Sequence, residues 1–374
     1  MRERHILITN QQLCTRSGTE LYVMDLARSL QSLGHRPIVF ASKTGALAES
    51  LVRQSIPVLD NLRDIAVEPD LIHGHHNLET MSAMLRFPNS PGIFVCHDSF
   101  AWHDRAPEFP RIYRYVAVDN ACYDRLSVRD GVPTSKIELI QNGVDLKKFR
   151  SRGVLPQTPR RALLMSNYAG PSQYMLINRV CRKMGIQLDA VGSQFGNVLE
   201  KPEQALGQYD VVFAKGRCAW EALAVGAAVI VCDTIGCGAM VTSSEIERMA
   251  ASNFGRRLLN EPISTKVLIR ELKKYNSDDA ALVSKAVRKR SNLSGIAHQL
   301  TDLYEAVIRE HAEAVRDRDQ ELVASSHYLQ WWAANRTRLV KESEKKYRPD
   351  RVVKRAISGL RKQAVRKLMV RRVA

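Results

Sequence analysis

The sequence lacks the features that mark zinc-binding, secreted or membrane-spanning proteins. Its seven cysteines are scattered without a C-x-x-C pair, so neither a zinc knuckle nor a thioredoxin motif is present. No apolar run follows the opening MRERHILITN, and no stretch approaches the ~18 uncharged apolar residues of a membrane span. We therefore expect a cytoplasmic protein whose cysteines are mostly small buried hydrophobes in a reducing compartment.

Internal repeats and low-complexity tracts are also absent, and the histidines do not follow a metal-ligand pattern. Half of the ten histidines lie within 31 residues, namely His73, His75, His76, His97 and His103. No H-E-x-x-H or comparable spacing accompanies them, so we expect no metal site. His73 and His75 alternate along DLIHGHH and are interpreted as structuring the end of a strand.

Positive charge is abundant and is concentrated at the C-terminus. The 374 residues carry a formal net charge of +17, and residues 341–374 hold thirteen lysines and arginines against three acids, which leaves +7 for the first 340 residues. Residues 351–374 place apolar side chains on one helical stripe and cations opposite it, which suits an anionic membrane surface. A basic tail could also bind nucleic acid, but this one has no recognisable nucleic-acid-binding motif, so we expect no specific nucleic-acid binding. A solvated, disordered tail is the remaining alternative.

The length and the 45% apolar content favour two domains. Short apolar runs without in-out alternation, such as residues 5–10 and 36–41, are separated by helical patterns such as residues 19–33. This alternation is typical of parallel strands that are covered on both faces. It breaks at RSRGVLPQTPRR, which begins at Arg150, and then restarts.

We therefore predict an α/β protein with two doubly wound Rossmann-like domains. The domains are expected at residues 1–149 and 162–310, joined by a linker at 150–161 and followed by a helical basic extension at 311–374. Ligands of such sheets bind outside the carboxyl ends of the strands. The loops after LITN, VCHD, LMSN, VFAKG and IVCD should therefore face one cleft.

Five segments resemble those of a known enzyme family, and they occur in the order that the family shows. They are SGTELYVMDLARSLQSLGH, DLIHGHH, FVCHD, GVPTSKIELIQNGVDLKKF and WEALAVGAAVIVCD. On these segments, the chain resembles the nucleotide-sugar glycosyltransferases of the GT-B fold, closest to the retaining family-4 enzymes. The resemblance covers about residues 5–242.

The resemblance implies a hexosyltransferase-like enzyme that uses a nucleoside-diphosphate sugar as substrate, retains the anomeric configuration and needs no cofactor. Breaking the donor's glycosidic bond leaves negative charge on the diphosphate. Helix N-termini, glycine backbone and fixed cations stabilise that charge, so no metal is required if the protein provides the cations.

The resemblance also implies roles for particular residues. Ser17 and Gly18 stand where the family usually has two glycines near the donor phosphates, before the first long helix. Glu221 would accept hydrogen bonds from the ribose hydroxyls, and His97 would contact the donor sugar near the reacting centre. The alternatives are an ordinary helix start at Gly18 and compensation of the helix dipole by Glu221.

The second domain departs from the family pattern at two places. The position of a second family glutamate is Phe213, and the family's cations after the first strand of this domain are missing. Ser166 and Asn167 stand in that loop instead, and we assign them to donor binding.

We infer that two other cations replace the missing ones. Lys215 and Arg217 flank Gly216 in the shortened turn AKGRC and would neutralise part of the diphosphate. Arginine suits this role because its planar donors grip phosphate oxygens bidentately. The alternative is a solvated pair of loop cations.

The sequence thus predicts a peripheral membrane glycosyltransferase of polysaccharide biosynthesis, which acts on a lipid-linked, polysaccharide or other glycan acceptor. Two alternatives stay open. A sugar-nucleotide epimerase on the same fold would need an acid/base carboxylate set that we cannot locate. A non-catalytic protein that binds nucleotide sugars or glycans would explain the missing cations and glutamate.

Overall fold

The computed structural model describes residues 2–347 of the chain. Contacts divide the chain into two units. The first comprises residues 1–107 and 111–315, and the second comprises residues 108–110 and the chain from residue 316. The first unit contains two β-sheets. We call each sheet, with the helices that pack on it, the first lobe and the second lobe.

The first lobe is built on seven parallel strands: β1 (His5–Leu13), β2 (Arg36–Thr44), β3 (Val58–Leu59), β4 (Leu71–His75), β5 (Gly92–Cys96), β6 (Ile112–Ala117) and β7 (Ile137–Leu139). Their order in the sheet is β3-β2-β1-β4-β5-β6-β7. Every residue of β4 and β5 is buried, so both faces of the sheet are covered.

Four helices connect these strands: α1 (Gly18–Ser32), α2 (Ala46–Val52), α3 (Asn77–Arg86) and α4 (Asn120–Asp124). The local sequence explains the limits of α1. Ser17 is its N-cap, and the backbone N–H of Ser17 donates to the carboxylate of Glu20 at 3.3 Å. Gly34, with a φ of +85°, lets the chain turn away after the helix. The sequence predicted this helix to within one residue at each end.

The second lobe has five strands: β8 (Arg161–Met165), β9 (Gln187–Val191), β10 (Val211–Ala214), β11 (Ala228–Asp233) and β12 (Gly236–Met240). Their order is β12-β11-β10-β8-β9, and all pairs are parallel except β11 with β12. The sequence prediction of two doubly wound α/β sheets is therefore confirmed. The antiparallel edge strand, formed by the small residues GCGAM, was not predicted.

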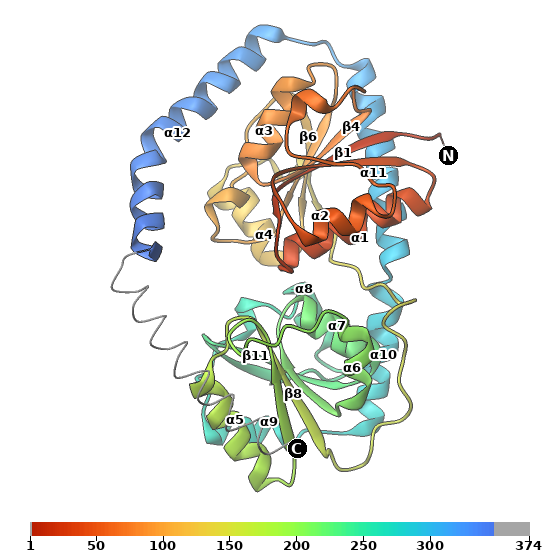
Figure 1. The fold of residues 1–374 in the computed structure, drawn as a ribbon, viewed down its shortest axis with the longest axis vertical. Helices are drawn as coiled ribbons and strands as arrows, with labels where there is room; N and C mark the ends of the chain where they lie inside the picture. The colour runs from red at the N-terminus through yellow and green to blue at the C-terminus, as the bar shows by residue number, and fades with distance from the viewer. Residues whose placement is uncertain (1, 348–374) are drawn as a thin grey trace. The chain divides into compact units, whose positions relative to one another are not determined.

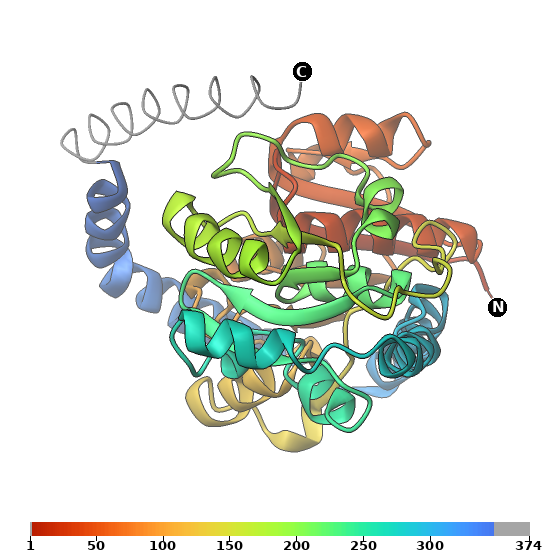
Figure 2. The same ribbon diagram turned by 90° about the horizontal axis from the view of Figure 1, so that it is seen from below.

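Helices flank the second sheet on both faces: α5 (Pro171–Lys183), α6 (Pro202–Ala205), α7 (Arg217–Val225), α8 (Ile246–Ala251), α9 (Thr265–Leu272) and α10 (Ser277–Arg290) (Figure 2). Alternate residues of β10 enter different cores. Val211 and Phe213 pack with α5 and α9, whereas Val212 and Ala214 pack with α7, α8 and α10.

The chain returns to the first lobe through α11 (Leu293–Glu313) (Figure 1). The hydroxyl of Tyr304 lies 2.5 Å from Nδ1 of His73, and Nε of Arg4 donates to Glu305 at 2.8 Å. A helix within the predicted second domain thus packs on the first lobe. The predicted domain limits stay predictions.

The second unit contains the last described helix, α12 (Arg318–Tyr347). Within residues 2–347, no helix combines the length and the apolar character that crossing a membrane requires. The basic amphipathic helix predicted at residues 351–374 lies outside the described residues.

Each sheet reverses its strand order at one point, where ligands of such sheets bind. The reversal falls between β1 and β4 in the first lobe and between β8 and β10 in the second. The carboxyl end of β8 leads to Ser166, and that of β10 leads to Lys215. Two predicted site residues therefore stand at the second reversal.

Candidate functional site

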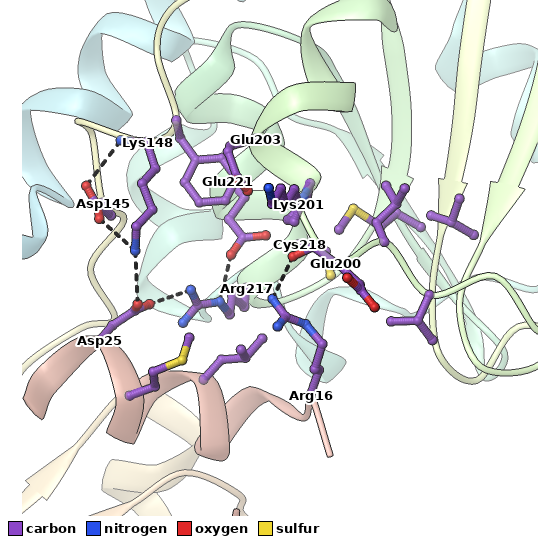
Figure 3. A pocket seen from close by; sticks show the side chains of 18 of the residues that line it. Arg16, Asp25, Asp145, Lys148, Glu200, Lys201, Glu203, Arg217, Cys218 and Glu221 are labelled. Atoms are coloured by element: carbon purple, nitrogen blue, oxygen red, sulfur yellow. Dashed lines mark hydrogen bonds and ion pairs between the residues drawn. The ribbon is translucent and has the colours of Figure 1, made fainter. Parts of the chain in front are cut away.

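A cleft of about 300 Å³ is lined by side chains of both lobes (Figure 3). Its charged lining is balanced. The cations are Arg16, Arg28, Lys148, Lys201 and Arg217, and the carboxylates are Asp25, Asp145, Glu200, Glu203 and Glu221. Of the nine predicted site residues, the ones that line the cleft are Ser166, Asn167, Arg217 and Glu221.

Arg217 joins the two lobes at this cleft. Its Nη2 donates to Oδ2 of Asp25 on α1 at 2.5 Å, and its Nε donates to Oε1 of Glu221, one turn further along α7, at 2.7 Å. Asp25 also lies 3.8 Å from Nζ of Lys148, which contacts Asp145 at 3.0 Å. The side chains of Asp25 and Glu221 are each only 5% exposed, so water offers their charges little compensation.

Burial and neighbouring charge act in opposite directions on Glu221. Burial raises the pKa of its carboxyl, the charge and hydrogen bond of Arg217 lower it, and the net pKa remains above the ordinary value. Burial also lowers the pKa of Arg217, but Asp25 and Glu221 more than reverse that effect. The guanidinium is therefore firmly charged and is the group that offsets the burial of Glu221.

Lys215 forms a second ion pair beside the cleft. Its Nζ lies 2.6 Å from Oδ2 of Asp233, whose Oδ1 accepts the Ser166 hydroxyl at 2.8 Å. The Ser166 hydroxyl oxygen in turn accepts the backbone N–H groups of Tyr168 and Ala169. Lys215 is one-third exposed, and its ammonium lies 5.0 Å from the centre of the Tyr168 ring. Lys215 and Ser166 thus share one carboxylate.

The remaining predicted residues of the second lobe shape its loops. Oδ1 of Asn167 accepts the backbone N–H of Ser193 at 3.1 Å, which ties together the loops after β8 and β9. Gly216 precedes α7 with a φ of +54°, a conformation that favours glycine. Neither residue contacts Lys215 through a hydrogen bond within the described part of the chain.

Ser17 and Gly18 stand at the start of α1 and do not line the cleft. A Cβ added to Gly18 would meet nothing within 4 Å, so no neighbouring part of the chain requires glycine there. The adjacent Arg16 does line the cleft, and its Nη2 donates to the backbone carbonyl of Glu200 in the second lobe at 2.9 Å.

His97 follows β5 and lies outside the cleft lining. Its Nε2 is 2.9 Å from Nδ1 of His75, and its ring centre is 4.7 Å from that of Tyr22 on α1. Burial is the main reason why the pKa of His97 falls to about 4. His97 is therefore a neutral imidazole at pH 7.

Three neighbouring side chains resemble a metal site, because ligand atoms of His76, His103 and Asp104 lie within 4.8 Å of one another. Their hydrogen bonds oppose that role. Nδ1 of His76 accepts the backbone N–H of Gln11 at 3.0 Å, so neutral His76 carries its proton on Nε2 and offers no second lone pair. Asp104 accepts the backbone N–H of His97 at 2.8 Å and lies 3.3 Å from Nε2 of His103. The cluster instead fixes the loop that carries His97.

Most charged residues of the cleft were not predicted from the sequence, and Asp25, Arg28 and Lys148 are among them. Asp25 gave a signal, because it stands between Met24 and Leu26 in the apolar run of a helix and is buried. A carboxylate in such a run implies a cation from elsewhere in the fold. That cation is Arg217, which lies 192 residues further along the sequence, so the residues around Asp25 could not predict it.

We predict that Arg217→Ala lowers the free energy of unfolding by about 3–5 kcal/mol near pH 8, because it leaves the buried carboxylate of Glu221 without its cation. Without Arg217 the pKa of Glu221, already raised, rises further. A raised folded-state pKa means that the native protein takes up the proton first, so the loss should grow as the pH increases. Denaturant unfolding at pH 5 and pH 8 measures this difference.

Lys148→Ala is the matched control. It removes a cation of the same network whose side chain is 40% exposed, so screening by solvent limits the loss to about 1 kcal/mol or less. A loss for Arg217→Ala that is the same at both pH values would contradict the assignment of the buried charge to Glu221.

Comparisons with known proteins agree with this architecture. Residues 16–148 match Glycosyltransferase Family 4. No curated protein matches the chain. A glycosyltransferase from Rickettsia africae shares 15% identity over 82% of this chain and 99% of its own, with a TM-score of 0.59.

Two further structures are similar at low identity. HepE from Anabaena, in complex with UDP and glucose, shares 14% identity over 81% of this chain and 100% of its own, with a TM-score of 0.58. The glycotransferase of kitacinnamycin shares 13% identity over 81% of this chain and 99% of its own, with a TM-score of 0.50. Identities this low show the fold alone. The chain therefore has a GT-B fold, and the match of residues 16–148 to Glycosyltransferase Family 4 supports a glycosyltransferase.

Proposed function

We propose that this glycosyltransferase takes its sugar from a nucleoside-diphosphate sugar bound in the cleft, and transfers it with retention and without a metal. The observation that carries the proposal is the lining of the cleft. Glu221, Ser166 and Asn167 face it from the second lobe, and Arg16 and Asp25 face it from the first. Fixed carboxylate, hydroxyl and guanidinium groups are the partners that a sugar nucleotide requires.

Glu221 is the proposed ribose ligand. Only Oε1 is engaged by Arg217, which leaves Oε2 to accept from a hydroxyl. The similarity to HepE, which binds UDP and glucose, makes UDP-glucose the first donor to test.

Lys215, Arg217 and the backbone around Gly216 are the proposed partners of the diphosphate. They stand at the N-terminus of α7, where the helix dipole favours negative charge. Both cations are already paired with carboxylates, so a diphosphate would be received by exchange of partners rather than by free charges. Cations supplied in this way make a metal ion unnecessary for leaving-group stabilisation.

The reacting end of the donor sugar is proposed to lie at His97. A neutral imidazole can orient a sugar hydroxyl but cannot supply a positive charge. The acceptor is proposed to be a lipid-linked or polysaccharide glycan, and residues 341–374, with their excess of ten positive charges, are proposed to bring the enzyme to an anionic membrane.

We predict that Glu221→Ala weakens UDP binding about tenfold or more, since a hydrogen bond to a charged group is lost from the cleft. Calorimetric titration with UDP and turnover of UDP-glucose measure the effect. Glu203→Ala is the control, because Glu203 lines the same cleft without a hydrogen bond to Arg217. Unchanged affinity would reduce Glu221 to a partner of Arg217, and absence of turnover with UDP-, GDP-, ADP- and CMP-sugars would overturn the proposed function.

Lys215→Ala should reduce the rate of transfer about a hundredfold, while the affinity for UDP changes much less. The reason is that charge on the diphosphate develops as the glycosidic bond breaks, so the cation stabilises the transition state more than the bound substrate. Steady-state kinetics compared with UDP titration separate the two effects. Lys215→Arg, which keeps the charge beside Asp233, should recover part of the rate, and a fully active Lys215→Ala would exclude Lys215 from the reaction.

Deletion of residues 341–374 should abolish sedimentation with anionic liposomes and leave transfer to a soluble acceptor intact. Attraction between surface charges is screened by salt, so binding of the full chain should also fall between low and high ionic strength. Liposomes of neutral lipid are the control. Full sedimentation of the truncated chain would show that the tail is not the membrane-binding segment.

A further inference from the structure

A row of buried histidines stands behind His97. His73 and His75 lie two residues apart on β4 and therefore point to the same face of the sheet, with ring centres 4.6 Å apart. Both have no exposed surface. His75 is in contact with His97, and its Nδ1 lies 2.9 Å from Nε2 of His97. One of these two nitrogens must donate and the other must accept.

The second ring nitrogen of His75 decides which one donates. Nε2 of His75 is buried and has no hydrogen-bond partner among the described residues. If Nε2 carried the proton, a buried N–H would be left without an acceptor, which native proteins avoid more strictly than an unfilled lone pair. The proton of His75 therefore belongs on Nδ1, from which it donates to Nε2 of His97.

We propose that His75 is a positioning residue that fixes the tautomer of His97, so that His97 carries its proton on Nδ1 and acts on the substrate as a hydrogen-bond donor. No hydrogen bond to Nδ1 of His97 occurs within residues 2–337, and the side chain is half-buried rather than enclosed. The Nδ1–H group is thus available to a bound molecule.

Both rings are neutral in this arrangement, as the assignment requires. Burial lowers the pKa of His97 to about 4 and that of His75 well below its usual value. Each neutral ring carries one proton on one of its two nitrogens. Because Nε2 of His75 has no acceptor, only one arrangement leaves no buried N–H without a partner: both rings carry the proton on Nδ1.

This inference rests on the proposed function, and it limits the chemistry of His97. An imidazole that presents N–H to the sugar can hold a hydroxyl oxygen, but it has no lone pair there with which to remove a proton from the acceptor. His97 is therefore not the general base. An inverting transfer, which needs a base for the acceptor hydroxyl, is disfavoured at this residue, whereas retention is compatible with it.

The test is direct observation of the ring protons. Full-length protein labelled with ¹⁵N-histidine is examined by two-bond ¹H–¹⁵N correlation between pH 6 and pH 8, a method in which the two tautomers give different patterns. The signals of His97 are identified by their loss in His97→Gln. The expected result is protonated Nδ1 and bare Nε2, and a protonated Nε2 on His97 would overturn the proposal.

Two variants of His75 test its role as positioning residue. His75→Asn keeps an N–H near the place of Nδ1, and His75→Leu removes it. With Asn, His97 should retain the Nδ1–H pattern and a third or more of the transfer rate. With Leu, both tautomers of His97 should appear and kcat should fall about tenfold, with a smaller change in the donor KM.

His35→Leu is the matched control for the loss of a buried histidine. His35 is 3% exposed, and its ring nitrogens have no hydrogen-bond partner among the described residues. The control should leave the His97 pattern as in the parent. If His75→Leu does not fold, the parent spectrum and His75→Asn still decide the question.

The two proposals fail in different ways. An Nδ1–H tautomer in a protein that turns over no sugar nucleotide would overturn the proposed function and leave the tautomer assignment standing. Normal turnover with Nε2–H on His97, or an Nδ1–H pattern that persists in His75→Leu, would overturn the role of His75 alone.

Discussion

One guanidinium between two buried carboxylates holds the cleft of this protein together. Arg217 binds Asp25 of the first lobe and Glu221 of its own helix, and both carboxylates are almost fully buried. Opposite charges attract strongly where water is excluded, but the same exclusion makes each charge costly if its partner is lost. The arrangement therefore specifies how the N-terminal half of α1 meets the start of α7, because displacement of either helix would strand a charge.

The balance of charge in the cleft bears on how a diphosphate would be received. Every negative charge that enters competes with carboxylates for the same cations. The exchange need not leave Asp25 without a cation, because Lys148 already lies 3.8 Å from it and can pair with it if Arg217 turns to a phosphate. A neutral ligand would have no means to drive that exchange. The network thus favours a doubly charged ligand over a neutral sugar of similar size.

The sequence was informative where structure depends on neighbouring residues. Apolar runs and helical spacing are local, so the two sheets and the limits of α1 could be predicted. The return of α11 could not, because it rests on pairs such as Arg4 with Glu305, 301 positions apart. The same difference divides the site: Glu221 and Arg217 lie within one turn and one motif, whereas Asp25 enters the cleft only through the packing of the two lobes.

The protonation of the histidines also depends on contacts that the local sequence does not show. As letters, DLIHGHH and FVCHD permit any tautomer, and only the spacing of their histidines speaks against a metal site. The fold removes that freedom in steps. The backbone N–H of Gln11 donates to Nδ1 of His76, so the lone pair of that nitrogen is not available to a metal ion. Nε2 of His75 has no hydrogen-bond partner among the described residues, so the proton of His75 lies on Nδ1, which faces His97. A buried N–H group without an acceptor destabilises the fold, so the tautomer of His97 depends on the hydrogen bonds available to His75. The chemistry of His97 is thus set by a residue that does not touch the substrate.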